Sequence, residues 1–166
     1  MSFTNRISQA LHEEHRATVA LMERLEQLMV RFRRNPPNSD DAAIAALLRD
    51  LTSGVESEVQ RHFSFEEERL FPYLGAIGDE AIGAHLTDEH TIMRPIATHL
   101  AAMAREASAK GFDKRTWDEF QRVGQELCDR MLAHVQKEEM ALLPLLEDNM
   151  DAETESQLVS EYLENA

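Results

Sequence analysis

The sequence predicts an all-α protein: an up-down-up-down four-helix bundle followed by a short C-terminal helix. Apolar residues recur at spacings of three and four along most of the 166 residues, which is the periodicity of amphipathic helices. Alternating, strand-like stretches bounded by turn residues are missing. Proline and glycine interrupt the helical pattern at only a few places, so long helices must be joined by short loops.

The first two helices are separated by the run Asn35-Pro36-Pro37-Asn38. A helix over about 4–33 should end there, because proline disfavours helical geometry in the residue before it. We expect Ser39 or Asp40 to cap the second helix, which continues to about residue 73.

The third helix is predicted over about 79–110. It ends at Gly111, and its internal Pro95 should kink it. A fourth helix follows over about 113–148. We expect a short amphipathic helix over about 151–163 to pack across the outside of the bundle. Its apolar side carries Leu158, Val159, Tyr162 and Leu163. Residues 1–166 have the length of a single domain, with the four-helix bundle over about 4–148.

The amino-acid composition limits the kinds of molecule that we expect the protein to bind. The chain has 17 Lys and Arg against 31 Asp and Glu, a net charge of -14, which repels nucleic acid and anionic lipid. No apolar run is long enough to cross a membrane, and the N-terminus lacks a signal region, so we expect a cytoplasmic protein. The lone Cys128 suits a reducing compartment and is expected to be a small buried apolar residue.

The chain also repeats itself. Residues 11–15 (LHEEH) match residues 86–90 (LTDEH) at an offset of 75, and residues 61–74 match residues 133–146 at an offset of 72. The first helix pair is therefore echoed by the second. A repeated helix pair builds a pseudo-symmetric bundle that presents equivalent side chains from both halves at its centre.

Ionisable residues interrupt the apolar stripe of all four long helices. They occupy positions where leucine is expected, and they are His15, His62, Glu66, His90, His134 and Glu138. Burying a carboxylate without a partner costs several kcal/mol, so something must compensate this charge. A cation does so most simply, because residues i and i+4 lie one above the other on a helix and can bind the same ion.

The number of ligands favours two metal ions over one. Six side chains would crowd a single ion, whereas two octahedral ions share twelve positions. Four histidines fill four of these, two bridging carboxylates fill four, and a bridging oxo or hydroxo group fills two. Two positions remain for a small diatomic molecule or peroxide. Nitrogen and oxygen ligands without thiolate suit iron, with manganese as a substitute, and argue against structural zinc.

These residues resemble the hemerythrin-like family, also called the HHE cation-binding domain. Its signature places His, His-x-x-x-Glu, His and His-x-x-x-Glu on successive helices. The same order occurs here over about 11–146, and both His-x-x-x-Glu motifs lead into an apolar residue and a proline, at Phe71-Pro72 and Leu143-Pro144. The resemblance implies a non-haem di-iron centre bridged by Glu66 and Glu138, which binds dioxygen or reacts with peroxide or nitric oxide.

One departure from the family pattern concerns a fifth histidine. Oxygen-carrying hemerythrins have it one turn from the other histidine on the third helix, where this chain has Leu86 and Arg94. The departure argues against simple reversible oxygen carriage. A second coordination position is then open, or is filled by His12 or His85. The Glu-x-x-His motif of ferritin-like proteins does not occur on these stripes, which argues against ferroxidase chemistry.

Three functions fit this ligand set. Binding or sensing of dioxygen or a related small oxidant or gas is favoured, so that a binding protein is expected rather than an enzyme. The alternatives are a di-iron enzyme acting on peroxide or nitric oxide, and iron buffering or storage. All three need the same ligands, so the sequence separates them poorly.

Several neighbouring residues allow two interpretations. Glu14 and Glu89 could orient the histidines or be ordinary helix-surface charge, and His99 should be exposed. Of Phe63 and Phe65, one should pack against a neighbouring helix, while the other could be exposed and support a homodimer. The acidic residues that follow the glutamate ligands are expected on a solvated face. They are Glu67, Glu68 and Glu139.

Overall fold

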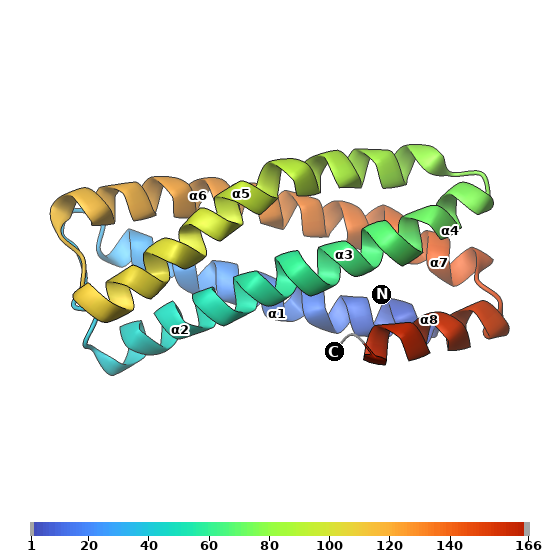
Figure 1. The fold of residues 1–166 in the computed structure, drawn as a ribbon, viewed down its shortest axis with the longest axis horizontal. Coiled ribbons are helices and arrows are strands. Elements are labelled where there is room, and N and C mark those ends of the chain that lie inside the picture. Colours follow the sequence, from blue (N-terminus) through green and yellow to red (C-terminus); the bar gives the residue numbers. More distant parts are fainter. Residues whose placement is uncertain (1, 165–166) are drawn as a thin grey trace.

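A computed structural model describes residues 2–164, which are helical throughout apart from short connections (Figure 1). The long helical stretches lie side by side, and a last helix packs at one end (Figure 1). They are α1 (Arg6–Arg31), α2 (Ala42–Ser57) continuing through α3 (Phe63–Phe65) to α4 (Phe71–Ala76), α5 (Glu80–Lys110), α6 (Lys114–Lys137) continuing to α7 (Leu143–Asn149), and α8 (Ala152–Glu164). The all-α prediction is confirmed for these residues.

Side-chain caps fix where the helices begin. The Asn5 side chain accepts hydrogen bonds from the Ile7 and Ser8 amides at the start of α1. Asp41 caps α2, one residue beyond the Ser39 or Asp40 expected from the sequence. Asp113 and Thr116 form a reciprocal capping box at the start of α6, close to the predicted position.

Helix α5 contains Pro95 and ends at Gly111. Figure 1 shows α5 changing direction near its middle, in keeping with an internal proline. Gly111 has φ 77°, a left-handed conformation that glycine adopts without steric cost, and its amide donates to the Ala107 carbonyl.

In the part of the chain that the structure describes, three π-helical turns interrupt the long helices. They cover Glu58–His62, Glu66–Leu70 and Glu138–Leu142. In the last two, an amide bonds to the carbonyl five residues back: Phe71 to Glu66 and Leu143 to Glu138. A proline follows each bond directly. Because proline has no amide hydrogen and its ring clashes with the carbonyl four residues back, a widened turn is a way to keep the helix continuous.

Two apolar cores lie on either side of the buried ionisable residues. In α1, Met22 belongs to the first core and Leu11 to the second core, with His15 between them. In α5, Leu86 and Met93 flank His90 in the same way. The histidines therefore form a polar layer across the bundle, closed by hydrocarbon above and below.

Helix α8 covers the outside of the second core, as expected. It buries Leu158 and Tyr162, while Leu163, predicted on the apolar side, is 64% exposed. The prediction that Leu163 lies on the apolar side of this helix was therefore wrong. Within residues 2–164, none of the helices combines the length and the apolar character that crossing a bilayer requires.

Candidate metal centre

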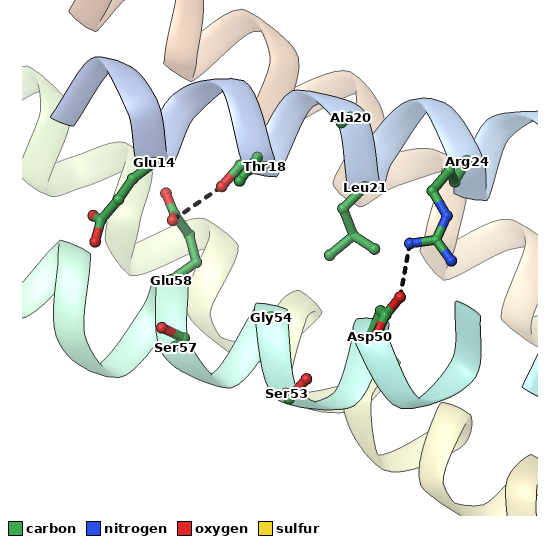
Figure 2. Close-up of a pocket in the computed structure, with 11 residues that line it drawn as sticks. Glu14, Thr18, Ala20, Leu21, Arg24, Asp50, Ser53, Gly54, Ser57 and Glu58 are labelled. Atoms are coloured by element: carbon green, nitrogen blue, oxygen red, sulfur yellow. Dashed lines mark hydrogen bonds and ion pairs between the residues drawn. The ribbon is translucent and has the colours of Figure 1, made fainter. Parts of the chain in front are cut away.

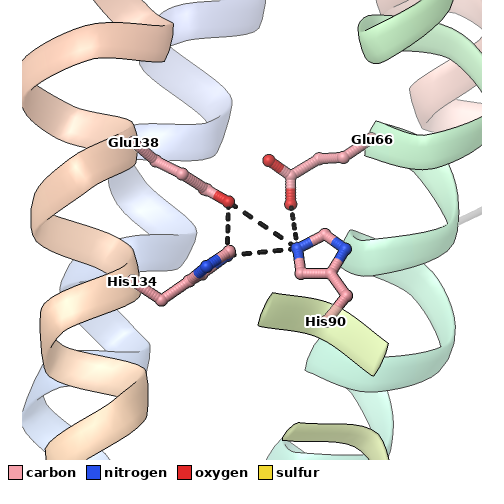
Figure 3. Close-up of side chains that lie close together, drawn as sticks. All are labelled: Glu66, His90, His134 and Glu138. Atoms are coloured by element: carbon pink, nitrogen blue, oxygen red, sulfur yellow. Dashed lines mark hydrogen bonds and ion pairs between the residues drawn. The ribbon is translucent and has the colours of Figure 1, made fainter. Parts of the chain in front are cut away.

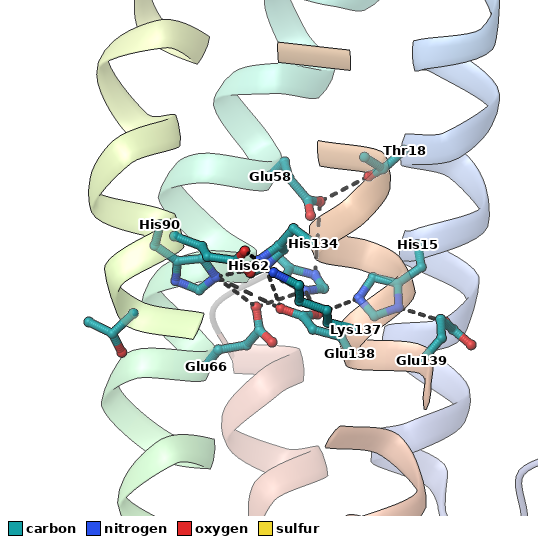
Figure 4. A network of polar contacts seen from close by, with 12 residues as sticks. His15, Thr18, Glu58, His62, Glu66, His90, His134, Lys137, Glu138 and Glu139 are labelled. Atoms are coloured by element: carbon teal, nitrogen blue, oxygen red, sulfur yellow. Dashed lines mark hydrogen bonds and ion pairs between the residues drawn. The ribbon is translucent and has the colours of Figure 1, made fainter. Parts of the chain in front are cut away.

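The six side chains that interrupt the apolar stripes meet in one buried layer. None of them is more than 2% exposed. Figure 4 shows them converging on one another, with His15 from α1 and His90 from α5 on opposite sides. The sequence thus identified side chains that the fold brings together.

Four of them form a first cluster, in which Glu66, His90, His134 and Glu138 could hold one ion (Figure 3). His134 Nε2 lies 2.6 Å from Glu138 Oε1 and 3.1 Å from His90 Nε2. His90 Nε2 is also 3.6 Å from Glu66 Oε1. These atoms face a common space, as ligands of one cation do.

A second cluster combines His15, His62 and Glu138. His15 Nε2 lies 2.7 Å from Glu138 Oε2, and His62 Nε2 lies 3.6 Å from the same oxygen. His62 Nε2 is also 3.0 Å from Glu66 Oε1. Glu138 therefore belongs to both clusters and offers one oxygen to each, while Glu66 lies between His62 and His90.

Several buried atoms of this layer have no hydrogen-bond partner. They are His62 Nε2, both carboxylate oxygens of Glu66, Glu138 Oε1 and His90 Nδ1. Buried polar atoms without partners are rare and each costs free energy. Three of these five atoms, His62 Nε2, Glu66 Oε1 and Glu138 Oε1, lie within 4 Å of inward-facing atoms from other helices or turns of the clusters. Imidazole nitrogens and carboxylate oxygens left unsatisfied in this way fit a site for two cations with mixed nitrogen and oxygen ligands.

The pKa values of the buried histidines and glutamates show that this layer favours positive charge. Burial lowers the pKa of His15 and His134, but hydrogen bonds and attraction to Glu138 outweigh burial and raise each pKa to about 9. The pKa of Glu138 is held well below its ordinary value against the effect of burial, chiefly by His134. Burial, reinforced by the charge of Glu138, raises the pKa of Glu66 to about 8. Protons therefore supply part of the charge that cations would provide.

A carboxylate faces the outer nitrogen of each histidine. Nδ1 lies 2.6 Å from Glu139 in His15, 2.6 Å from Glu14 in His62 and 3.0 Å from Glu89 in His134. For His90 the separation from Glu67 is 3.8 Å. The three short contacts fix the rings of His15, His62 and His134 and leave each Nε2 directed inward, which is the arrangement of metal-binding histidines, whereas His90 Nδ1 has no hydrogen-bond partner.

We call these four glutamate side chains the outer carboxylates. Their positions decide between interpretations that the sequence left open. Glu14 and Glu89 orient histidines rather than being plain surface charge. The solvated face expected for Glu67 and Glu139 was wrong, because their side chains are only 20% and 24% exposed and face His90 and His15. Glu68 is exposed as expected.

No fifth histidine joins the clusters among the described residues. Leu86 is buried in the apolar core, and Arg94 forms an ion pair with Glu67. His12 contacts Glu139 at 2.9 Å and is one-third exposed. His85 lies at the surface, 3.2 Å from Lys137 Nζ. His99, expected to be exposed, is about half exposed and pairs with Glu119.

Both phenylalanines beside His62 are buried, so the expectation that one of them is exposed was wrong. The Phe63 ring stacks on His90 at 3.8 Å and 5°. The Phe65 ring meets Tyr162 of α8 edge-on at 5.2 Å. Neither ring offers a surface for self-association, because each packs inside the chain. Cys128 is buried, as expected, and its own burial raises its pKa to about 12.

The sequence interpretation missed Glu58, which is buried four residues before His62 on the same face of the helix. Its carboxylate accepts a hydrogen bond from the Thr18 hydroxyl and lies 3.9 Å from His62 Nδ1. Figure 2 shows Glu58 and Glu14 at one end of a cavity of about 350 Å³ between α1 and α2. The spacing of four residues from His62 was a signal that could have identified Glu58.

Comparison with known proteins adds one finding. The family model described as the Hemerythrin HHE cation binding domain matches residues 6–146, and a second match covers residues 81–164. The first match contains all six side chains of the two clusters. A search of curated proteins finds no match.

Proposed function

Because this chain belongs to the hemerythrin HHE cation-binding domain family, we propose that it is a non-haem di-iron protein that binds or senses dioxygen or a related small oxidant. The proposal includes a single domain with the up-down-up-down four-helix arrangement predicted from the sequence. One observation carries it. Two clusters of buried metal-ligating side chains share Glu138, and most of their unpartnered atoms face the space between them.

Each ion has its own set of residues in this proposal. His90 and His134 would hold one ion, His15 and His62 would hold the other, and the carboxylates of Glu66 and Glu138 would be shared between them. A pair of iron ions, once bound, supplies reversible one-electron chemistry and coordination positions for a small ligand. Manganese is the substitute that the same ligands would accept.

Other side chains orient the histidines of this layer and limit the access of water to it. Three of the outer carboxylates accept hydrogen bonds from the rings of His15, His62 and His134 and keep the Nε2 of each directed inward. The apolar cores on both sides, together with Phe63 stacked on His90, limit the access of water. A small uncharged molecule enters such a layer at lower cost than a charged one does.

Metal analysis with optical spectroscopy tests the proposal. The protein loaded with ferrous iron under anaerobic conditions should contain two irons per chain. Admitting dioxygen should give a new visible absorption that disappears when dioxygen is removed, without turnover. One zinc per chain as the native content, or no spectral response to dioxygen, would contradict the proposal. Glu138→Ala should fail to retain both irons, because Glu138 belongs to both clusters.

A second candidate function, breakdown of peroxide or reaction with nitric oxide, is favoured by the missing fifth histidine. Leu86 and Arg94 stand where that histidine would be, and neither supplies a ligand. The free coordination position suits turnover better than stable carriage. Sustained release of dioxygen from added peroxide by the iron-loaded protein would favour the enzyme. Ready loss of iron to a weak chelator, with neither behaviour, would instead favour iron buffering.

A further inference from the structure

The pseudo-symmetry of the chain makes it possible to compare the outer carboxylates pairwise. Glu14 directly precedes His15, and Glu89 directly precedes His90. Each contacts a histidine of the neighbouring helical stretch: Glu14 lies 2.6 Å from His62, and Glu89 lies 3.0 Å from His134. The two glutamates are therefore equivalent. Each also accepts a hydrogen bond from a second donor through the carboxylate oxygen that does not contact the histidine.

In the second half of the chain that donor is Lys137. It lies three residues after His134, and its ammonium is 2.5 Å from Glu89 Oε2. The position three residues after His62 in the first half is Phe65, whose side chain has no donor. The repeat alone would leave Glu14 without the contact that its counterpart has.

Helix α8 supplies the missing donor. The Tyr162 hydroxyl donates to Glu14 Oε1, and Arg61 Nη1 lies 3.4 Å from the same oxygen. The Tyr162 ring is held from two sides, by the edge-on contact with Phe65 and by the Arg61 guanidinium 4.8 Å from its centroid. Phe65, which stands where the second half has Lys137, thus packs against the ring whose hydroxyl replaces the lysine as donor.

We propose that Tyr162 is a positioning residue of the metal centre, taking in the first half of the chain the place that Lys137 takes in the second. Through Glu14 it holds the His62 ring with Nε2 directed inward, so that α8 is part of the metal site as well as a cover for the bundle. The inference rests on the proposed function, because it assigns a role toward the ion that His62 would bind.

The test compares two substitutions of the same kind. Tyr162→Phe removes the hydroxyl and keeps the ring, and Tyr73→Phe is the matched control. The Tyr73 hydroxyl donates to the Asn149 carbonyl at 2.9 Å, and Tyr73 does not contact the clusters. Metal-free protein is titrated with Co²⁺ alone, followed by calorimetry. The parent and Tyr73→Phe should bind two ions equally well. Tyr162→Phe should bind one of the two about 10- to 100-fold more weakly.

A spectroscopic measurement separates positioning from a merely structural role. Histidine ring N–H resonances of the metal-free, ¹⁵N-labelled protein report whether each Nδ1–H is held by its carboxylate. In Tyr162→Phe the His62 signal should exchange faster with water or disappear, while the His134 signal stays unchanged. Lys137→Met should have the converse effect, on His134. Circular dichroism of each variant checks that the helices are intact.

The outcomes distinguish this inference from the proposed function. If the parent binds two Co²⁺ ions and Tyr162→Phe matches it in both affinity and the His62 signal, the inference is wrong and the proposed function stands. If the parent binds no Co²⁺, the proposed function fails and the inference fails with it. Weakening of both ions by equal factors would also overturn the inference, because Glu14 contacts His62 and no other histidine of the clusters.

Discussion

Replacing each of the two central glutamates by glutamine should change the stability of the metal-free protein in opposite directions. Glu66 and Glu138 are both fully buried, and each begins a π-helical turn. Glutamine keeps the size and shape of the side chain and removes its charge. The two substitutions therefore differ only in which protonation state the folded protein imposes on the carboxyl group.

For Glu66 the folded protein imposes the protonated form. Burial and the charge of Glu138 raise its pKa from 4.5 to about 8. Because the pKa is raised, the protonated Glu66 carboxyl group makes its full contribution to the free energy of unfolding below pH 4.5. This contribution is lost progressively as the pH rises toward 8. At about 1.4 kcal/mol per pH unit, the loss amounts to about 3 kcal/mol at pH 7. Glu66→Gln has no proton to take up, so it should be more stable than the parent by that amount at pH 7.

For Glu138 the folded protein imposes the ionised form. His134, His15 and His62 hold its pKa well below the ordinary value despite burial. Glu138→Gln would leave buried imidazolium groups without their counter-charge. Removing one partner of a buried ion pair costs about 3–5 kcal/mol, so this variant should be destabilised by a similar amount at pH 7.

Urea unfolding followed by circular dichroism, after metal has been removed with a chelator, measures both effects. The stability gain of Glu66→Gln should be present at pH 7 and vanish near pH 4, where the parent carboxyl group is protonated in both states. Equal destabilisation by the two substitutions would refute this assignment of charges. So would a gain for Glu66→Gln that does not depend on pH.

Three further predictions concern other parts of the molecule. Cys128 should resist iodoacetamide in the native protein at pH 8 and react fully in denaturant, as seen by mass spectrometry, because burial raises its pKa to about 12. Gly111→Ala should lower the unfolding free energy by about 1–2 kcal/mol in urea titrations, because φ is 77° there, whereas a loss near zero would contradict this. Metal held at 100 times its dissociation constant should stabilise the protein by about 3 kcal/mol, and thermal unfolding with and without chelator should reveal this difference.

The sequence predicted the all-α fold and the residues of the central layer because both depend on local periodicity. His62 and Glu66 stand four residues apart where leucine is expected, and the same pattern recurs at His134 and Glu138. A helical stripe is a property of consecutive residues, so it can be read before the fold is known. The repeat then indicated that both halves contribute to one layer.

The outer contacts were harder to predict, for two physical reasons. Glu67 and Glu139 directly follow Glu66 and Glu138, about 100° around the helix, and a projection of one helix does not show that their flexible side chains reach a histidine of another helix. Tyr162 reaches Glu14 from a helix 148 residues further along the chain. A contact of that kind depends on how α8 docks, and no periodicity within a single helix encodes it.

The π-helical turns have a consequence for how a cation reaches a layer sealed by hydrocarbon on both sides. These turns leave the regular helical pattern of hydrogen bonds, and they lie beside the most deeply buried charges of the chain. Local opening of a folded chain involves contiguous segments and needs less free energy than global unfolding. We expect the stretches that carry Glu66 and Glu138 to be the segments that open to admit an ion, while the two apolar cores keep the rest of the bundle assembled.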